Sequence, residues 1–175
     1  MNESTREQYF IKRLEALPSG ERAELKRACG QHLNESDAKA FGIFYKVLPQ
    51  GVPPWQEDRW FCTACLSCLW RPSDEEGKPM EECLAVLKEK GSQSFENRIV
   101  AMLDGEWTAD GRLGLKLFRM AKLIRQKGMK VNTAALLADL CNWDRVSRKV
   151  QKRWARAICK APETETQNDK PQKEE

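Results

Sequence analysis

The chain lacks the sequence features of a membrane protein, an exported protein or a β-rich fold. Its longest nearly apolar stretch, Phe61 to Trp70, has ten residues, whereas a membrane-spanning helix needs about 20. The amino terminus, MNESTREQYF, has no basic region followed by an apolar run, so we expect a cytoplasmic protein without a signal peptide. No segment alternates apolar and polar residues for long enough to predict a strand.

Residues that support common catalytic chemistry are also scarce. The chain has one histidine, His32, and no P-loop, GxGxxG, nucleophile elbow or HExxH motif. Acidic residues at 74–76 and 81–82 flank a polar connector. They could hold a hard cation, but a solvated acidic loop is the simpler interpretation. We therefore expect a protein that is not an enzyme and that needs no cofactor.

The seven cysteines leave one chemical alternative open. An odd number of cysteines in a cytoplasmic chain argues against a disulfide framework. Cys62, Cys65 and Cys68 form a CxxCxxC motif, and with Cys83 they could hold zinc or an iron–sulfur cluster. Because the motif lies within a continuous helical pattern, residues spaced by three diverge around the helix. Buried thiols are therefore favoured, and a Cys-ligated metal or redox protein is kept as an alternative.

The hydrophobic pattern predicts an all-α protein of about nine helices in a two-lobed bundle. A box of Ser4 and Glu7 is expected to cap the first helix, and Asp144 the last. Apolar neighbours at helical spacing place Trp60, Trp143 and Trp154 in the core and leave the other three tryptophans unassigned. The predicted helices cover about 4–17, 19–32, 36–48, 54–70, 80–90, 94–103, 110–127, 133–140 and 144–160.

The domain organisation follows from composition. We expect an amino-terminal helical lobe over 1–91 and a basic carboxy-terminal helical lobe over 92–160. Residues 161–175 are expected to form a disordered acidic tail, because PETETQNDKPQKEE has no apolar residue to bury.

Positive charge is concentrated in one part of the chain. The net charge is only +4, but residues 112–160 contain fourteen lysines and arginines and only two acids, Asp139 and Asp144. The segments on either side, 1–111 and 161–175, are both net acidic. A basic excess of this kind repels itself unless an anion lies nearby, and nucleic-acid phosphate is the commonest such partner.

Two predicted helices carry most of this excess. The helix over 110–127 places Arg112, Lys116 and Arg119 on successive turns, with Lys122 near them. No motif that reads base edges accompanies the cations, so we expect contact with the phosphate backbone and little sequence preference. A free-standing helical DNA-binding regulator remains an alternative.

The second basic helix is expected to start at Asp144. At about 100° per residue, seven of its cations lie on one side: Arg145, Arg148, Lys149, Lys152, Arg153, Arg156 and Lys160.

Residues 8–158 also carry a distinctive order of motifs. FIKRLEALPSGERAELKRACG is followed by FYKVLP and RWFCTACLSCLW, and then by SFENRIVAMLDGEWTAD, LKLFRMAKLIRQKGMKVN, LLADLCNW and VQKRWARAI. In this order and spacing the chain resembles the CasB family, the small subunit of the type I-E CRISPR Cascade surveillance complex. It departs from the family at Asn132-Thr133, where Asp-Trp is frequent.

The resemblance implies an all-helical protein without enzymatic activity. It implies partners as well: the other Cascade subunits, crRNA, target DNA and a second copy of the chain. A basic surface would help to hold the target DNA and the displaced strand of the R-loop. Lys26, Arg27, Arg98 and Arg119 match basic positions of the family, and Arg59 matches less well. Together with charge geometry, this predicts a nucleic-acid surface of Lys26, Arg27, Arg59, Arg98, Arg112, Lys116, Arg119, Lys122, Arg145, Arg148, Lys149, Lys152 and Arg156.

Overall fold

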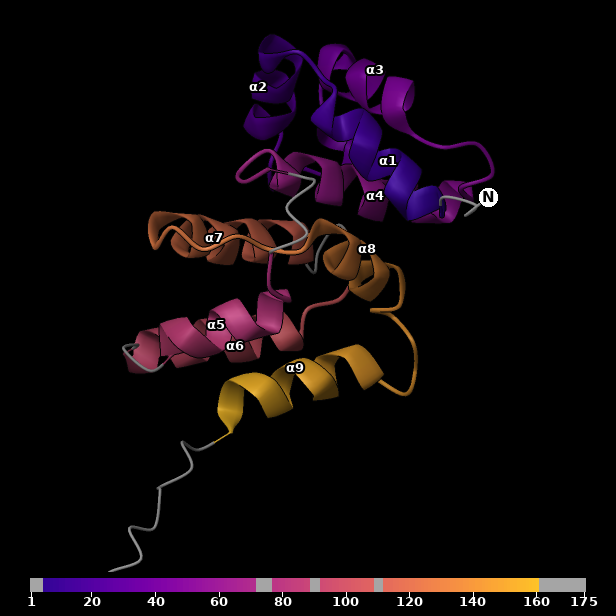
Figure 1. The fold of residues 1–175 in the computed structure, drawn as a ribbon. Helices are drawn as coiled ribbons and strands as arrows, with labels where there is room; N and C mark the ends of the chain where they lie inside the picture. Colours follow the sequence, from indigo (N-terminus) through magenta and orange to yellow (C-terminus); the bar gives the residue numbers. More distant parts are fainter. Residues whose placement is uncertain (1–4, 72–76, 89–91, 109–111, 161–175) are drawn as a thin grey trace, which may run out of the picture.

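The computed structural model describes residues 5–71, 77–88, 92–108 and 112–160. Within these ranges the chain forms nine α-helices and no strand, which confirms the predicted all-α fold (Figure 1). The predicted acidic tail lies outside the described residues. The helices are α1 (Arg6–Glu15), α2 (Ser19–Arg27), the short 3-10 helix η1 (Leu33–Glu35), α3 (Ala38–Val47), α4 (Pro54–Ser67), α5 (Met80–Lys88), α6 (Gln93–Leu103), α7 (Leu113–Gln126), α8 (Thr133–Cys141) and α9 (Lys149–Cys159).

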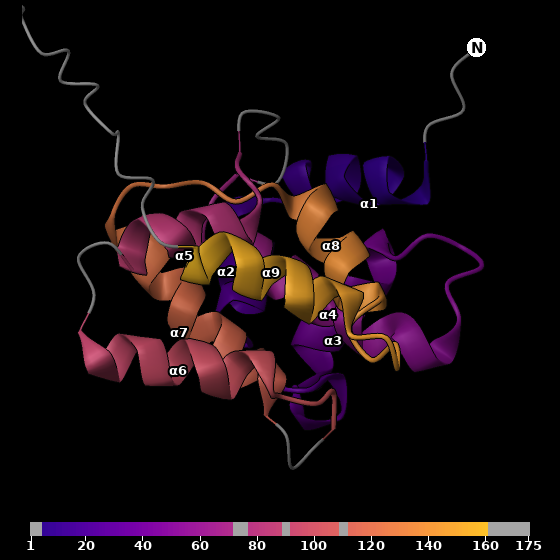
Figure 2. The ribbon, with the colours of Figure 1, turned by 90° about the horizontal axis from the view of Figure 1, so that it is seen from below.

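The helices are stacked in three levels (Figure 1). Helices α1 to α4 form the upper level, α7 and α8 the middle one, and α5, α6 and α9 the lower one. Helix α8 packs against α4 and α1, whereas α5 packs against α9 and α7. Seen from below, α9 lies along α5 and α6 (Figure 2). Helix α8, from the second half of the sequence, thus packs against helices of the first half, and α5, from the first half, packs against helices of the second. The predicted lobe boundary at residue 91 stays a prediction.

One continuous apolar cluster joins the three levels. Trp60, Trp143 and Trp154 are at most 3% exposed, as predicted. The rings of Trp143 and Trp154 meet edge to face at 5.2 Å, and Trp154 Nε1 donates to the buried Asp139 carboxylate at 2.8 Å. Burying aromatic rings whose N–H groups are satisfied is a large stabilising contribution per residue.

No helix in the described ranges combines the length and the apolar character that a bilayer crossing demands.

Most helix starts lie where the capping signals predict. Asp37 and Asn132 accept hydrogen bonds from backbone N–H groups in the first turns of α3 and α8. The first capping box is made by Thr5 and Gln8, one residue after the predicted pair of Ser4 and Glu7. In each of these caps, a side-chain oxygen satisfies an N–H group that has no partner within the helix.

The last helix begins later than predicted. Asp144 does not cap it, because α9 starts at Lys149 after Arg148, whose backbone is left-handed (φ 49°). The Asp144 carboxylate is instead paired with Arg59 of α4 and accepts the backbone N–H of Trp107. Residues 142–148 lie outside any helix, so the predicted face of seven cations on one helix is wrong.

Candidate nucleic-acid interface

Four of the predicted cations line one groove between α6 and α7. Arg98 comes from α6, and Lys116, Arg119 and Lys122 come from α7. The groove has a volume of about 470 Å³, and none of the described residues that line it is acidic. A groove lined by charges of one sign attracts an extended anion more strongly than scattered surface charges do.

The local sequence of α7 explains why these side chains face outward. Apolar residues recur at helical spacing along α7 and are buried against the core, which leaves the opposite side of the helix to its cations. The apolar residues that line the groove are Ala101, Met120 and Leu123. The buried residues of α7 are Leu113, Gly114, Leu117, Met120, Ala121 and Ile124.

Two of the four cations in the groove make contacts within the protein. Lys116 Nζ donates to the carbonyl of Ala101 at 3.1 Å, and Lys122 Nζ lies 4.8 Å from the centre of the Phe118 ring. Cations are favourable near the carbonyl end of a helix because of its partial negative charge. Neither contact involves a carboxylate, and no ion pair among the described residues involves either lysine.

Arg98 and Arg119 are the freest cations of the groove. Both side chains are exposed, and no ion pair within the described ranges involves either of them. Arg112, at the start of α7, is also exposed and has a left-handed backbone (φ 47°). The strongest positive potential is therefore expected along α7, from Arg112 toward Lys122.

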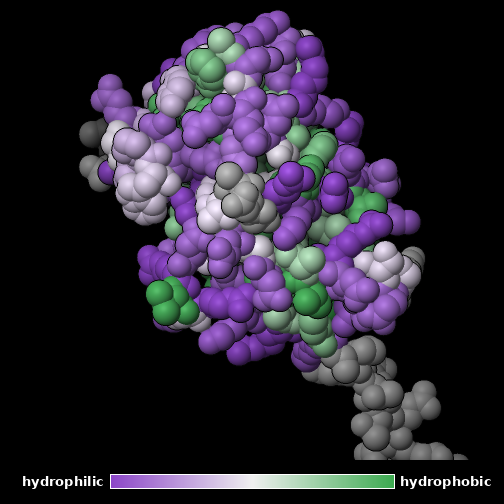
Figure 3. All heavy atoms as spheres, turned by 180° about the vertical axis from the view of Figure 1, so that it is seen from behind, coloured by the Kyte–Doolittle hydropathy of each residue, from purple (hydrophilic) through white to green (hydrophobic). Residues whose placement is uncertain are grey.

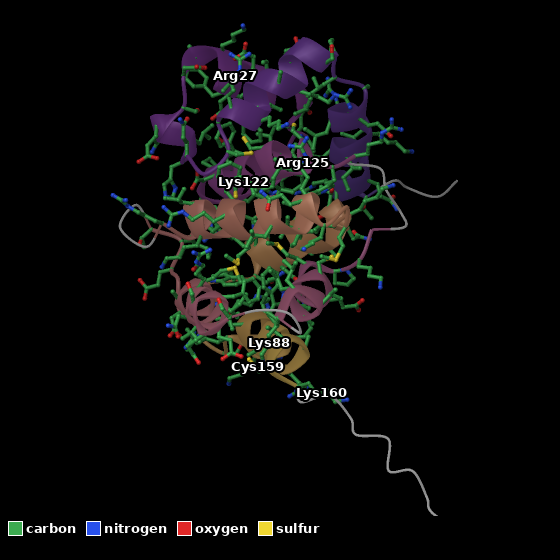
Figure 4. All side chains as sticks on the ribbon, turned by 90° about the vertical axis from the view of Figure 1, so that its left-hand side faces the viewer. Arg27, Lys88, Lys122, Arg125, Cys159 and Lys160 are labelled. Atoms are coloured by element: carbon green, nitrogen blue, oxygen red, sulfur yellow. The ribbon has the colours of Figure 1, made fainter. Side chains whose placement is uncertain are left out.

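The basic surface continues past the groove on the side shown in Figure 4. There Lys122 and Arg125 project from α7, and Arg27 lies above them on the upper level. Arg27 is paired with Glu24 at 3.1 Å, and its side chain is 71% exposed. Its neighbour Lys26 is half-buried. Arg125 was not among the predicted contacts, because the helix pattern places it away from the stripe of Arg112, Lys116 and Arg119.

Helix α9 supplies a smaller set of cations than predicted. Lys149, Lys152 and Arg156 are exposed along it. Arg153 is instead held by two carboxylates, Glu81 at 3.1 Å and the buried Asp139. The hydrogen bond that Arg153 donates to Asp139 raises the pKa of Arg153 above its usual value. Arg153 thus links α9 to α5 and α8 and adds no free charge to the surface.

The two arginines of the loop before α9 have different surroundings. Arg145 is exposed and makes no ion pair within the described residues. Arg148 donates to the Leu103 carbonyl and to the Asp104 carboxylate, each at 2.9 Å. These bonds cap the carbonyl end of α6. Arg148 therefore positions the loop, whereas Arg145 is available at the surface.

The structure places Arg59 in the interior and not on the predicted nucleic-acid surface. It is only 8% exposed, donates to the Trp55 carbonyl at 2.7 Å and is paired with Asp144. Its guanidinium also lies 5.4 Å from the centre of the Trp107 ring. Arg59 opens the mostly apolar helical stretch RWFCTACLSCLW, and this is the sequence signal for such a buried pair. We therefore leave Arg59 out of the proposed interface.

The cysteine cluster has the environment of structural thiols. Cys62 and Cys65 are buried in α4, and burial raises the pKa of both thiols well above its ordinary value. Burial also raises the pKa of Cys68 to about 11. Metal ligation requires thiolates, and protonated thiols are favoured here. No three histidine, cysteine or acidic side chains among the described residues are grouped to hold a metal ion.

Seen from behind, the molecule is mostly hydrophilic with separate apolar areas (Figure 3). The large exposed apolar residues are distributed over several helices and loops: Tyr9, Phe41, Tyr45, Trp55, Val86, Val100 and Val146. Single exposed apolar residues are normal on a soluble protein surface.

Comparison with known families identifies the chain. Residues 21–157 match the family model of the CRISPR-associated protein Cse2. The chain belongs to the Cse2 family. The motifs SFENRIVAML and LKLFRMAKLIRQ, which carry much of the resemblance noted in the sequence, form α6 and α7 of this Cse2 family member. Both helices that form the groove lie within the matched residues.

Solved structures of the Cse2 and CasB type have the same fold as this Cse2 family member. A CasB crystal structure from Thermus thermophilus is 25% identical with a TM-score of 0.71, and the match covers 91% of this chain and 99% of that one. CasB from M. ruber is 24% identical with a TM-score of 0.69, covering 90% and 94%. A chain of a CRISPR RNA-guided surveillance complex is 19% identical with a TM-score of 0.66, covering 88% and 91%. No curated protein matches.

Proposed function

We propose that this Cse2 family member is the non-catalytic small subunit of a type I-E Cascade, a crRNA-guided CRISPR interference complex of the cytoplasm. In this proposal it assembles with the other Cascade subunits and with a second copy of itself. Its basic surface contacts the backbones of the target DNA and of the displaced strand. Family membership and the fold shared with a chain of a surveillance complex support the assembly.

The observation that carries the binding role is the groove between α6 and α7. Arg98, Lys116, Arg119 and Lys122 line it without a carboxylate among the described lining residues. Each phosphate that such cations neutralise releases condensed counterions from the nucleic acid, and this release is favourable. The groove offers few groups that could read base edges, so the expected binding follows the backbone and not the sequence.

Backbone contacts of this kind can decide whether an R-loop persists. The guide–target heteroduplex is about as stable as the DNA duplex that it replaces, so strand exchange is nearly balanced. A few charge-assisted contacts to separated strands are then enough to favour the open state. The subunit needs no catalytic group for this role.

The test is charge reversal in the groove within the assembled complex. Replacing Arg119→Glu and Lys122→Glu together should reduce R-loop formation on a matched target at least about tenfold at physiological salt, because attraction becomes repulsion. Assembly should be unchanged, since both side chains are exposed. R-loop formation is measured by permanganate reactivity of the displaced strand, and assembly by size-exclusion chromatography.

The matched control reverses two exposed cations of α1, Lys12→Glu and Arg13→Glu, which changes the net charge equally. This control should keep the R-loop yield of the unmodified complex. Equal yields from the groove variant and the unmodified complex, or equal losses from both variants, would contradict the proposed role of the groove.

A further inference from the structure

The groove between α6 and α7 has the chemistry of a binding site for any extended acidic chain. Its four cations come from both helices, and the side chains of Met120 and Leu123 also line it. The acid of α6 that is nearest in sequence to Arg98 is Glu96, which lies 3.9 Å from Lys88 of α5 and does not line the groove. Cations gathered in a concave surface attract a polyanion, whether it is a nucleic acid or a peptide.

The same chain carries an acidic segment directly after its last helix. Helix α9 ends at Cys159, and the sequence from position 161 onward is APETETQNDKPQKEE. This segment contains five acids and two lysines but no aromatic or large aliphatic residue. Acidic terminal segments of such composition are typical interaction tails, which bind a basic surface and do not join a core. The five acids are Glu163, Glu165, Asp169, Glu174 and Glu175.

The end of α9 and one end of the groove lie on the same side of the molecule. In Figure 1 the last turns of α7 and α9 both point toward the left of the view. Figure 4 shows that side from the front, with Cys159 and Lys160 at the end of α9 below Lys122 and Arg125 of α7. Lys122 lines the groove. A chain that leaves α9 there can therefore approach the groove along one face of the fold.

The acidic segment is long enough to reach the groove. Asp169 is nine positions beyond Lys160 and Glu175 is fifteen, which correspond to at most about 30 Å and about 50 Å of extended chain. A compact fold of about 160 residues has a radius of gyration of about 15 Å. The acids from Asp169 onward can therefore enter the groove, whereas Glu163 and Glu165 stay close to α9.

Several cations close to the end of α9 are already in contact with carboxylates, whereas those of the groove are not. Arg153 of α9 is held by two carboxylates, and Lys88 of α5 contacts Glu96. Arg98 and Arg119 in the groove are exposed and make no ion pair within the described residues. Acids that reach the groove therefore gain attraction without displacing a carboxylate of the fold.

We propose that residues 161–175 occupy the groove of the free subunit through the acids from Asp169 onward, and that a nucleic-acid strand displaces them. The contact is intramolecular, so an effective concentration of about a millimolar maintains it even when it is weak. A groove that is filled for about two thirds of the time binds a strand about threefold more weakly, because apparent affinity scales with the free fraction. This inference rests on the proposed function, and it adds self-inhibition that limits binding of the free subunit to other nucleic acids.

Zero-length carbodiimide cross-linking of the isolated chain, followed by peptide mass spectrometry, tests the contact directly. We expect acids within 169–175 to couple to Lys122 in the groove and not to Lys12, which is exposed on α1 of the upper level. Adding oligo-dT should remove these cross-links. Arg119→Glu should reduce them at least about threefold, because the groove then repels the segment. Lys12→Glu is the matched control and should leave them unchanged.

Deletion of residues 161–175 measures the competition. The deletion removes five acids and two lysines and so raises the net charge by three. Its matched control neutralises three exposed acids elsewhere, Glu15→Gln, Glu82→Gln and Glu106→Gln. In fluorescence anisotropy with labelled oligo-dT, the deletion variant should bind about threefold more tightly than the control at about 50 mM KCl. The difference should disappear at about 0.5 M KCl, where salt screens exposed charges.

Each outcome decides the inference. Cross-links that join the segment only to α9, or that occur only in dimer-sized species, would assign it to its own helix or to a second copy and overturn the inference. Cross-links that oligo-dT does not remove, or equal binding by the deletion variant and its control, would also overturn it. The R-loop assay on the groove variant is separate. An unchanged R-loop yield there, with the cross-links to Lys122 present, would reject the proposed function and keep the contact.

Discussion

Arg59 shows how one residue can have a different role from the one that its sequence context predicts. Charge and resemblance placed it at a nucleic-acid surface, but its guanidinium is buried against Asp144 and the rings of Trp55 and Trp107. The pair joins α4 to the loop of residues 142–148, across 85 positions of sequence. Its contribution is therefore expected in folding stability more than in binding.

Replacing Arg59→Met should lower the free energy of unfolding by about 2 kcal/mol, because it leaves Asp144 without its partner and opens the loop. Urea denaturation followed by far-UV circular dichroism measures this change. Arg98→Met, at an exposed position without an ion pair, should change stability by no more than about 0.5 kcal/mol. Equal effects of the two substitutions would show that the Arg59–Asp144 pair is not structural.

At the scale of single helices, caps and buried faces account for most of the observed boundaries. Helix α8 starts at the Asn132 cap, although this position departs from the pattern common in the family. Helix α2 ends at Arg27, earlier than predicted, and the chain then turns at Gly30 with a φ of 87°. Glycine adopts this left-handed backbone without steric cost.

Asn132→Ala should therefore destabilise the protein by about 1 kcal/mol, since the Ala135 N–H loses the oxygen that caps it. Asn132→Asp keeps an oxygen at the same place and should remain within about 0.5 kcal/mol of the unmodified protein. Thermal unfolding monitored by circular dichroism distinguishes the two variants. A similar loss in both would mean that the side-chain volume, and not the cap, stabilises α8.

At the scale of the whole molecule, the proposed binding is an electrostatic property of the arrangement of α6, α7 and α9. Each of these helices has an apolar side buried in the common core, so their cations are left on the outside. The positive surface is therefore a consequence of packing. Its strength depends on how few carboxylates from the rest of the chain reach it.

The salt dependence of target binding measures this property. With the groove variant Arg119→Glu, Lys122→Glu, the slope of log affinity against log salt should become shallower by about 1.4 to 1.8, because two phosphate contacts are lost at roughly 0.7 to 0.9 each. The α1 control should have the slope of the unmodified complex. Parallel lines for all three proteins, from titrations at several KCl concentrations, would exclude direct phosphate contact by these two side chains.

Local sequence alone was sufficient for the all-α class, for most helix starts and for the burial of Trp60, Trp143 and Trp154. These properties depend on residues within a few turns of one another, through hydrophobic periodicity and capping. The concentration of cations in residues 112–160 was equally visible, because charge can be counted without coordinates.

Only the tertiary structure decided which cations remain free. Arg59, Arg148 and Arg153 are held by carboxylates that lie 14 to 85 positions away in sequence. Asp144, the predicted cap of the last helix, is paired with Arg59, and that helix starts at Lys149. An ion pair forms where the fold brings two charges within a few ångströms, and helical periodicity carries no information about that distance.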